Sequence, residues 1–197
     1  MSPPVAGEWD DGWWRDATRV PSPNFSARPA GARVDTVVLH SISLPPGQYG
    51  GDGIRRLFTN TLDWSAHPYF ETIRGLEVSA HFVVRRDGEV LQFVSIDDRA
   101  WHAGRSAWGG REAANDWSIG IELEGLEGDT FEPAQYDALQ RLLPAIDHVQ
   151  GIRHVVGHEH VAPGRKIDPG PGFDWRELAA RLHWDAARIP PAGPRQN

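Results

Sequence analysis

The sequence predicts an α/β (α+β) fold in one domain, with helices packed on the faces of a mixed central β-sheet. Segments of strand and helix periodicity alternate along the chain, which is typical of a sheet covered by helices. One pair of strand segments flanks Asp87-Gly88, which is expected to supply the positive φ angles that a tight antiparallel hairpin turn needs, so the sheet cannot be wholly parallel. With 197 residues, 40% of them hydrophobic, the chain is long enough for one substantial core.

Three regions are expected along the chain. Residues 1–33 are rich in proline, glycine and tryptophan, and predict an irregular lead-in that packs on the domain through Trp13 and Trp14. Residues 34–184 contain the periodic segments and predict the domain itself. Residues 185–197 predict a flexible tail.

Four stretches have the character of strands. A β-branched apolar run predicts a buried strand at 36–39 that ends at His40. The hairpin follows over 80–95. Alternating isoleucine and leucine predict a strand at 118–123, and a short apolar run predicts another at 154–157.

Two helices are expected in the second half of the chain. The first spans Pro133 to about Val149, although Pro144 should kink it or end it early. Its buried face repeats at helical spacing through Leu139, Leu142, Leu143 and Ile146. The second spans 175–182, with Asp174 and Glu177 spaced as a capping box.

Residues 47–70 follow the Pro-Pro pair at 45–46 and begin with several glycines, which predicts a long loop with one short helix around 54–58. Loops of this length in compact domains are usually functional or mobile. We therefore hypothesise that this segment closes over a groove.

Composition excludes several classes of function. The formal net charge of −7 argues against a nucleic-acid binder, and no stretch approaches the ~20 apolar residues of a membrane helix. The N-terminus shows neither the basic nor the apolar part of a secretory signal, and cysteine is absent, which together favour the cytoplasm. Without cysteine, metal ligands must be histidines or carboxylates.

One segment carries the parts of a metal site. His158 and Asp168 lie on either side of a Pro-Gly break and the pair Arg165-Lys166. His40, at the end of a buried strand, is the strongest candidate for a third ligand, since catalytic zinc sites commonly use three protein ligands and leave one position open. His160 competes with His158, because residues two apart in an extended chain point to the same side.

A series of short motifs follows one order through almost the whole chain, from about residue 12 to about residue 178. They occupy residues 19–23, 38–47, 67–70, 78–81, 85–89, 99–104, 115–125 and 157–171. In these motifs the chain resembles the zinc-dependent N-acetylmuramoyl-L-alanine amidases, and within them the branch that acts on 1,6-anhydro-N-acetylmuramyl peptides. The resemblance implies the fold shared with T7-type phage lysozyme and the peptidoglycan recognition proteins.

The resemblance implies a role for five residues. One Zn²⁺ per chain would be held by His40, His158 and Asp168. Glu122 matches the general base, and Lys166 matches the cation that stabilises the tetrahedral intermediate. Amide hydrolysis needs both kinds of group.

Strand geometry alone does not choose between Glu122 and Glu124, which point the same way. The shared motifs also contain candidate substrate contacts or supports of the metal ligands, namely Tyr69, His81, Trp101, His102 and Arg165. Trp101 could cover a sugar ring or pack in the core.

Three positions depart from the pattern of that branch. Ser41 stands where an asparagine is usual, and Glu77 and Ala113 stand where basic residues are usual. Arg74 or Arg111 could compensate for the missing basic groups. We expect these departures to affect binding of the stem peptide and not the reaction itself.

The expected activity is hydrolysis of the amide bond between (1,6-anhydro-)N-acetylmuramic acid and L-alanine of muropeptides, in cytosolic peptidoglycan recycling. Two alternatives remain from the sequence. One is a periplasmic amidase of the same family that acts on intact peptidoglycan, and the other is a peptidoglycan-binding protein without catalysis.

Overall fold

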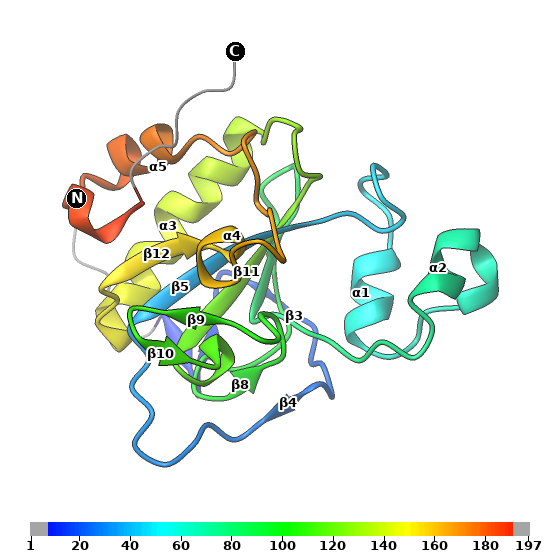
Figure 1. The fold of residues 1–197 in the computed structure, drawn as a ribbon, viewed down its shortest axis with the longest axis horizontal. Helices are drawn as coiled ribbons and strands as arrows, with labels where there is room; N and C mark the ends of the chain where they lie inside the picture. The colour runs from blue at the N-terminus through cyan, green and yellow to red at the C-terminus, as the bar shows by residue number, and fades with distance from the viewer. Residues whose placement is uncertain (1–7, 191–197) are drawn as a thin grey trace.

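A six-stranded mixed sheet forms the centre of the computed structural model, which describes residues 8–190 (Figure 1). Its strand order is β12-β5-β11-β6-β7-β3. The six strands are β3 (Thr18–Arg19), β5 (Thr36–Ile42), β6 (Phe82–Val84), β7 (Val90–Gln92), β11 (Ser118–Glu124) and β12 (His154–Gly157). Only the pair β6–β7 is antiparallel, which confirms the predicted mixed sheet.

The first strand of the core is longer than predicted. β5 continues beyond His40 to Ile42, because β11 pairs with it in parallel along its whole length. In this register His40 lies opposite Glu122, and Ile42 lies opposite Glu124. His40 is therefore held inside the sheet, at its carboxyl end.

The predicted hairpin is present, but its turn differs from the expected one. Gly88 has a φ of 88°, whereas Asp87 is not among the residues with positive φ. The Gly88 N–H donates to the carbonyl of Arg85, and the Arg85 N–H donates to that of Glu89, each at 2.9 Å. One left-handed glycine therefore closes the turn, where two consecutive left-handed residues were expected.

One face of the sheet is covered by α3 (Pro133–Gln150) and α5 (Trp175–Leu182) (Figure 1). α3 does not end early at Pro144, because its buried face packs against the sheet on both sides of the proline. Asp174 caps α5 through the N–H groups of its first turn, as predicted. The N–H of Asp174 donates to Tyr136 instead of Glu177, so the capping box is one-sided.

The opposite face carries α1 (Gly53–Phe58), α2 (Pro68–Thr72) and the single turn α4 (His158–Val161). The short helix predicted within 47–70 is α1. The same segment also contains η1 (Trp64–Ala66), so it is more ordered than a plain loop. Leu57 and Phe58 belong to the apolar cluster that joins α1 to the β6–β7 hairpin.

The lead-in adds to the sheet as well as packing on it. It contains β1 (Trp9–Asp10), β2 (Trp13–Trp14), the edge strand β3 and β4 (Phe25–Ser26). Trp14 is buried in the main core, and Trp13 lies under the guanidinium of Arg19. We propose on this basis that residues 8–33 fold together with the domain.

The remaining short elements lie beside the site or near the C-terminus. They are β8 (Arg99–Ala100), β9 (Ala107–Trp108), β10 (Arg111–Glu112), η2 (Ala114–Asp116) and η3 (Ala186–Arg188). Of the predicted tail, residues 191–197 lie outside the described part of the chain. Among the described residues, no helix combines the length and apolar character needed to cross a membrane.

Candidate active site

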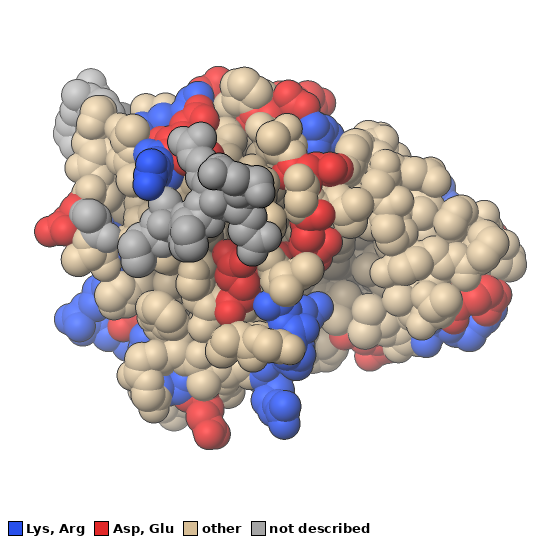
Figure 2. All heavy atoms as spheres, turned by 45° about the horizontal axis from the view of Figure 1, so that its top comes forward, with Lys and Arg blue, Asp and Glu red and all other residues tan. Residues whose placement is uncertain are grey.

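A cavity of about 360 Å³ opens at the carboxyl ends of β5 and β11, between the sheet and the α1–α2 lobe. The space-filling view shows this face hollowed beside that lobe, with acidic side chains nearby (Figure 2). One wall is polar and includes His40, Glu122 and Asp168, whereas the other is apolar and includes Leu57 and Phe58. The cavity thus offers a reactive wall facing an apolar one.

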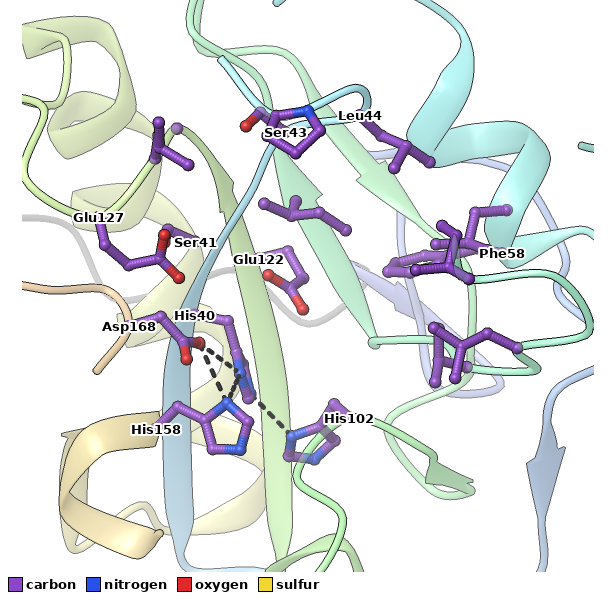
Figure 3. A pocket seen from close by; sticks show the side chains of 18 of the residues that line it. His40, Ser41, Ser43, Leu44, Phe58, His102, Glu122, Glu127, His158 and Asp168 are labelled. Carbon is purple, nitrogen blue, oxygen red and sulfur yellow. Dashed lines mark hydrogen bonds and ion pairs between the residues drawn. The ribbon is translucent and has the colours of Figure 1, made fainter. Parts of the chain in front are cut away.

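The structure brings together the three residues that the sequence singled out as metal ligands (Figure 3). His40 Nδ1 lies 2.9 Å from His158 Nδ1 and 3.2 Å from Asp168 Oδ2, and the latter two atoms are 3.0 Å apart. All three residues are buried. His158 follows β12 directly, so two neighbouring strand ends supply the two histidines.

Hydrogen bonds on the far side of each ring determine its tautomer. His158 Nε2 lies 3.1 Å from the carbonyl oxygen of Ala103, which can only accept, so this nitrogen carries the proton. His40 Nε2 lies 2.9 Å from His102 Nδ1. His102 Nε2 in turn faces the Ser118 hydroxyl, which donates its own proton to the Ala114 carbonyl.

His102 therefore donates through Nε2 and accepts at Nδ1, and His40 carries its proton on Nε2. Both ligand candidates then present the lone pair of Nδ1 to the same point, beside a carboxylate oxygen. Burial lowers the pKa of His40 to about 4, so its ring is neutral at neutral pH. Three lone pairs that converge without a proton between them fit a bound metal cation, and two nitrogens and one oxygen suit zinc.

His160 does not share this position. Residues 158–161 form a helical turn, so positions two apart point in different directions. The Nδ1 atom of His160 accepts a hydrogen bond from the N–H of Gly157 at 2.8 Å. This separates the two histidines that spacing alone left equivalent.

Glu122 reaches the cavity from β11, next to His40 in the register (Figure 3). Its Oε2 atom is buried and has no hydrogen-bond partner among the described residues. Burial, reinforced by the charge of Asp168, raises the pKa of Glu122 well above its usual range, and Lys166 opposes this effect. A buried acceptor without a protein partner is available to a water or a substrate group.

Glu124, the geometric alternative, is already engaged. One of its carboxylate oxygens accepts from the Gly50 N–H at 2.7 Å, and the other accepts from the Arg86 N–H at 3.2 Å. It does not line the cavity. Its contacts instead fasten the loop that precedes α1 to the end of β11.

Lys166 lines the cavity and is exposed, and it lies on the segment between α4 and Asp168. Its positive charge counters the rise in the pKa of Glu122, which places the two groups within electrostatic reach. The cation of Lys166 and the carboxyl group of Glu122 thus share one cavity with the three converging ligand atoms.

The five candidate substrate contacts divide into two groups. Tyr69, Trp101 and His102 line the cavity, and Tyr69 is exposed on its rim. His81 is fully buried and accepts from the Gly120 N–H, and Arg165 donates to the carbonyls of Ala103 and Arg105 at 2.7 Å. We propose that His81 and Arg165 support the site without touching substrate.

The departures from the family pattern have different surroundings. Ser41 lines the cavity, and its buried hydroxyl has no partner among the described residues. Arg74 pairs with Glu71, and Arg111 pairs with Asp35. Neither arginine lines the cavity, so neither replaces a basic group there.

Sequence reasoning missed the carbonyl of Ala103, which accepts from His158, and the side chain of Asn115, which accepts the backbone N–H groups of His102 and Ala103. A backbone carbonyl leaves no signal in residue type. Asn115 lies inside a shared motif, which was the only sequence signal that could have pointed to it.

Comparisons with known proteins agree with this geometry. The family model of N-acetylmuramoyl-L-alanine amidase matches residues 30–171. The 1,6-anhydro-N-acetylmuramyl-L-alanine amidase AmpD of Citrobacter freundii is 50% identical over 173 residues, which cover 87% of this chain and 92% of the relative. The chain belongs to the N-acetylmuramoyl-L-alanine amidase family and is AmpD-like within it.

Solved structures show the same likeness. A crystal structure of a selenomethionine derivative of AmpD is 49% identical, with a TM-score of 0.86 over 88% of this chain and 98% of that chain. The amidase AmiD from E. coli, solved with the substrate anhydro-N-acetylmuramic acid-L-Ala-D-gamma-Glu-L-Lys, is 31% identical, with a TM-score of 0.55 over 78% of this chain and 60% of that one. The predicted amidase fold is confirmed.

Proposed function

We propose that this protein is a zinc-dependent amidase that hydrolyses the bond between (1,6-anhydro-)N-acetylmuramic acid and L-alanine of muropeptides. The observation that carries the proposal is the convergence of two histidine nitrogens and one carboxylate oxygen beside Glu122, whose Oε2 atom has no partner among the described residues. The named activity of the AmpD relative and the substrate held by AmiD support the choice of bond.

Each residue of the site has a role in this proposal. His40, His158 and Asp168 hold the zinc ion, which supplies a Lewis acid and a nucleophile at neutral pH. Glu122 accepts the proton of the attacking water and returns it to the departing amine of L-alanine. Lys166 stabilises the negative charge that develops on the former carbonyl oxygen.

The proposed substrate matches the two walls of the cavity. A muropeptide joins a sugar to a polar peptide, and the cavity offers aromatic faces at Tyr69 and Trp101 beside the polar wall. We place the reaction in the cytoplasm, in peptidoglycan recycling, as the sequence predicted. Cell fractionation of the producing organism tests the location.

The decisive experiment incubates the zinc-loaded protein with 1,6-anhydro-muramyl tripeptide, N-acetylmuramyl tripeptide and intact sacculi, with products identified by mass spectrometry. We expect a free peptide with an L-alanine N-terminus, released fastest from the anhydro substrate. Glu122→Gln should keep its zinc by elemental analysis but lose turnover by about 10²–10⁴-fold. Binding without cleavage by the wild-type protein would contradict the proposal, and preference for sacculi would support the periplasmic alternative.

A further inference from the structure

The Nε2 atoms of His40 and His158 both form hydrogen bonds to two consecutive residues, His102 and Ala103. The ring of His102 accepts the N–H of His40, and the carbonyl of Ala103 accepts the N–H of His158. A shift of this segment would release both ring protons together. Whatever holds residues 102–103 therefore controls the direction of two lone pairs at once.

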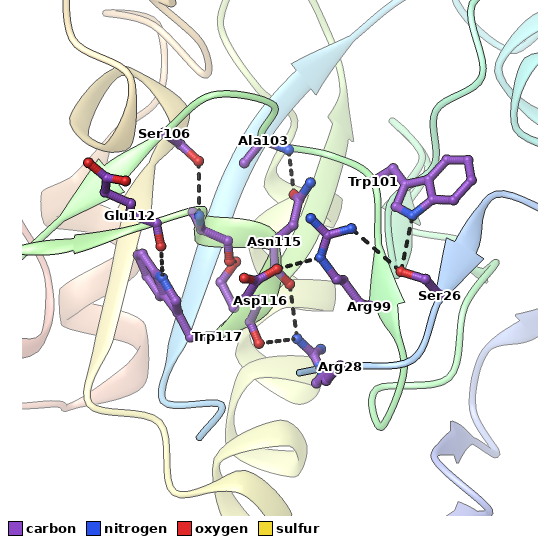
Figure 4. Close-up of polar contacts among 12 residues, drawn as sticks. Ser26, Arg28, Arg99, Trp101, Ala103, Ser106, Glu112, Asn115, Asp116 and Trp117 are labelled. Atoms are coloured by element: carbon purple, nitrogen blue, oxygen red, sulfur yellow. Dashed lines mark hydrogen bonds and ion pairs between the residues drawn. The ribbon is translucent and has the colours of Figure 1, made fainter. Parts of the chain in front are cut away.

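Two side chains hold that segment: Arg165 donates to the carbonyl of Ala103 at 2.7 Å, and Asn115 accepts both backbone N–H groups. Asn115 Oδ1 accepts the backbone N–H of Ala103 at 2.8 Å (Figure 4). It also accepts the backbone N–H of His102 at 3.2 Å. Asn115 is 7% exposed, so water cannot readily replace these bonds. Asn115 does not line the cavity, so it can act on the converging ligand atoms only through residues 102–103.

Asn115 is itself held firmly, on the short helix η2. The guanidinium of Arg28 donates to the carbonyls of Asn115 and Asp116 at 3.1 and 3.2 Å (Figure 4). The N–H of Ala114 donates to the hydroxyl of Ser106 at 3.0 Å. The turn is thus anchored on both sides of the asparagine.

We propose that Asn115 is a positioning residue that aligns residues 102–103 and thereby keeps His40 and His158 in the tautomer that presents Nδ1 to the metal. The proposal rests on the metal site of the proposed function. Outer hydrogen bonds of this kind orient metal-binding histidines and typically change metal affinity by about 10–100-fold when removed.

The test compares Asn115→Leu, which has a similar shape but no acceptor, with Asn115→Asp, which keeps the acceptor. Zn²⁺ affinity is measured by competition with a chelator, and ring tautomers are measured in the metal-free protein by two-bond ¹H–¹⁵N NMR. We expect Asn115→Leu to bind Zn²⁺ about 10–100-fold more weakly and to show mixed tautomers at His40 and His158. Asn115→Asp should keep the wild-type tautomers and restore most of the affinity.

Gln92→Met is the matched control, because the buried Gln92 side chain also accepts a backbone N–H, from Trp14 at 2.7 Å, but lies away from the cavity. It should lower the free energy of unfolding without changing tautomers or Zn²⁺ affinity. Unchanged tautomers and affinity in a folded Asn115→Leu would overturn the proposal. If Asn115→Leu does not fold, mixed tautomers in a folded Asn115→Asp would overturn it instead.

The two proposals can fail separately. A wild-type protein that binds no Zn²⁺ would refute the metal site, whereas the tautomers of the metal-free protein test Asn115 without any metal.

Discussion

At the scale of single residues, the site combines groups that would be costly elsewhere in a fold. Glu122 buries a carboxyl oxygen that has no hydrogen-bond partner in the described part of the chain, and two imidazole lone pairs face the carboxylate of Asp168. Such arrangements lower stability unless a ligand or a proton relieves them. The residues around the cavity are therefore expected to favour function at the expense of stability.

Glu122 should make the stability of the metal-free protein depend on pH. Its pKa is raised in the folded state from 4.5, so the folded state binds more protons than the unfolded state between the two values. Stability from this group is fully present below about pH 4.5 and is lost as pH rises through the folded pKa. Glu122→Gln should flatten this dependence and be the more stable protein at neutral pH.

Urea unfolding across a pH series measures this effect. Glu77→Gln, at an exposed position of the chain, controls for the loss of one carboxylate. Equal pH slopes for wild type and Glu122→Gln would show that the buried carboxyl group has the same pKa in both states.

At the scale of elements, the ring of His102 packs directly against the backbone of β11 at Gly120. A Cβ added at Gly120 would lie 2.4 Å from His102 Cγ, so only glycine leaves room for this ring beside His40. Glycine inside a strand often marks such a close approach. The site thus constrains the sequence of the strand at a position that contributes no side chain.

Gly120→Ala should displace His102 and lower the free energy of unfolding by about 1–3 kcal/mol, the usual range for overpacking. Zn²⁺ affinity should fall as well, because His40 loses its acceptor. Denaturant unfolding and chelator competition measure the two effects.

Gly51→Ala is the control for this substitution, since a Cβ there meets open space. It should change stability by no more than about 0.5 kcal/mol. A Gly120→Ala protein with wild-type stability and affinity would mean that the strand moves aside without effect on the site.

At the scale of the whole molecule, the site joins distant parts of the chain. The site lies at the carboxyl ends of β5, β11 and β12, where the segment that ends at Asp168 also arrives. A metal bound there therefore links separate regions of the fold. Metal binding to the folded state alone stabilises that state by mass action.

Free Zn²⁺ at 100 times its dissociation constant should therefore stabilise the protein by about 2.7 kcal/mol. For a chain of this length, this corresponds to a rise in Tm of about 5–10 °C. Differential scanning fluorimetry with Zn²⁺, and then with excess chelator, measures the rise and its reversal. His40→Ala should bind less zinc and show no rise, and an equal rise in that variant would remove His40 from the ligand set.

Much of the fold was readable from the sequence, because it depends on local patterns. Apolar runs and periodicity predicted the strands β5, β11 and β12 and the helix α3. The turn signal at Asp87-Gly88 predicted the hairpin, and the capping residues predicted α5. The errors arose where pairing overrides local preference. β5 extends past His40 because β11 pairs with it, and α3 passes through Pro144 because its buried face packs on the sheet.

The sequence by itself determined the donor chemistry. The absence of cysteine, the spacing around the Pro-Gly break and the shared motifs pointed to His40, His158 and Asp168. Spacing left His158 equivalent to His160 and Glu122 equivalent to Glu124, and only the resemblance chose between them. The tertiary structure supplied the physical reason, since each choice depends on where a helical turn or a neighbouring loop directs a side chain. It also revealed the support from Ala103 and Asn115, because hydrogen bonds between distant segments exist only once the chain is folded.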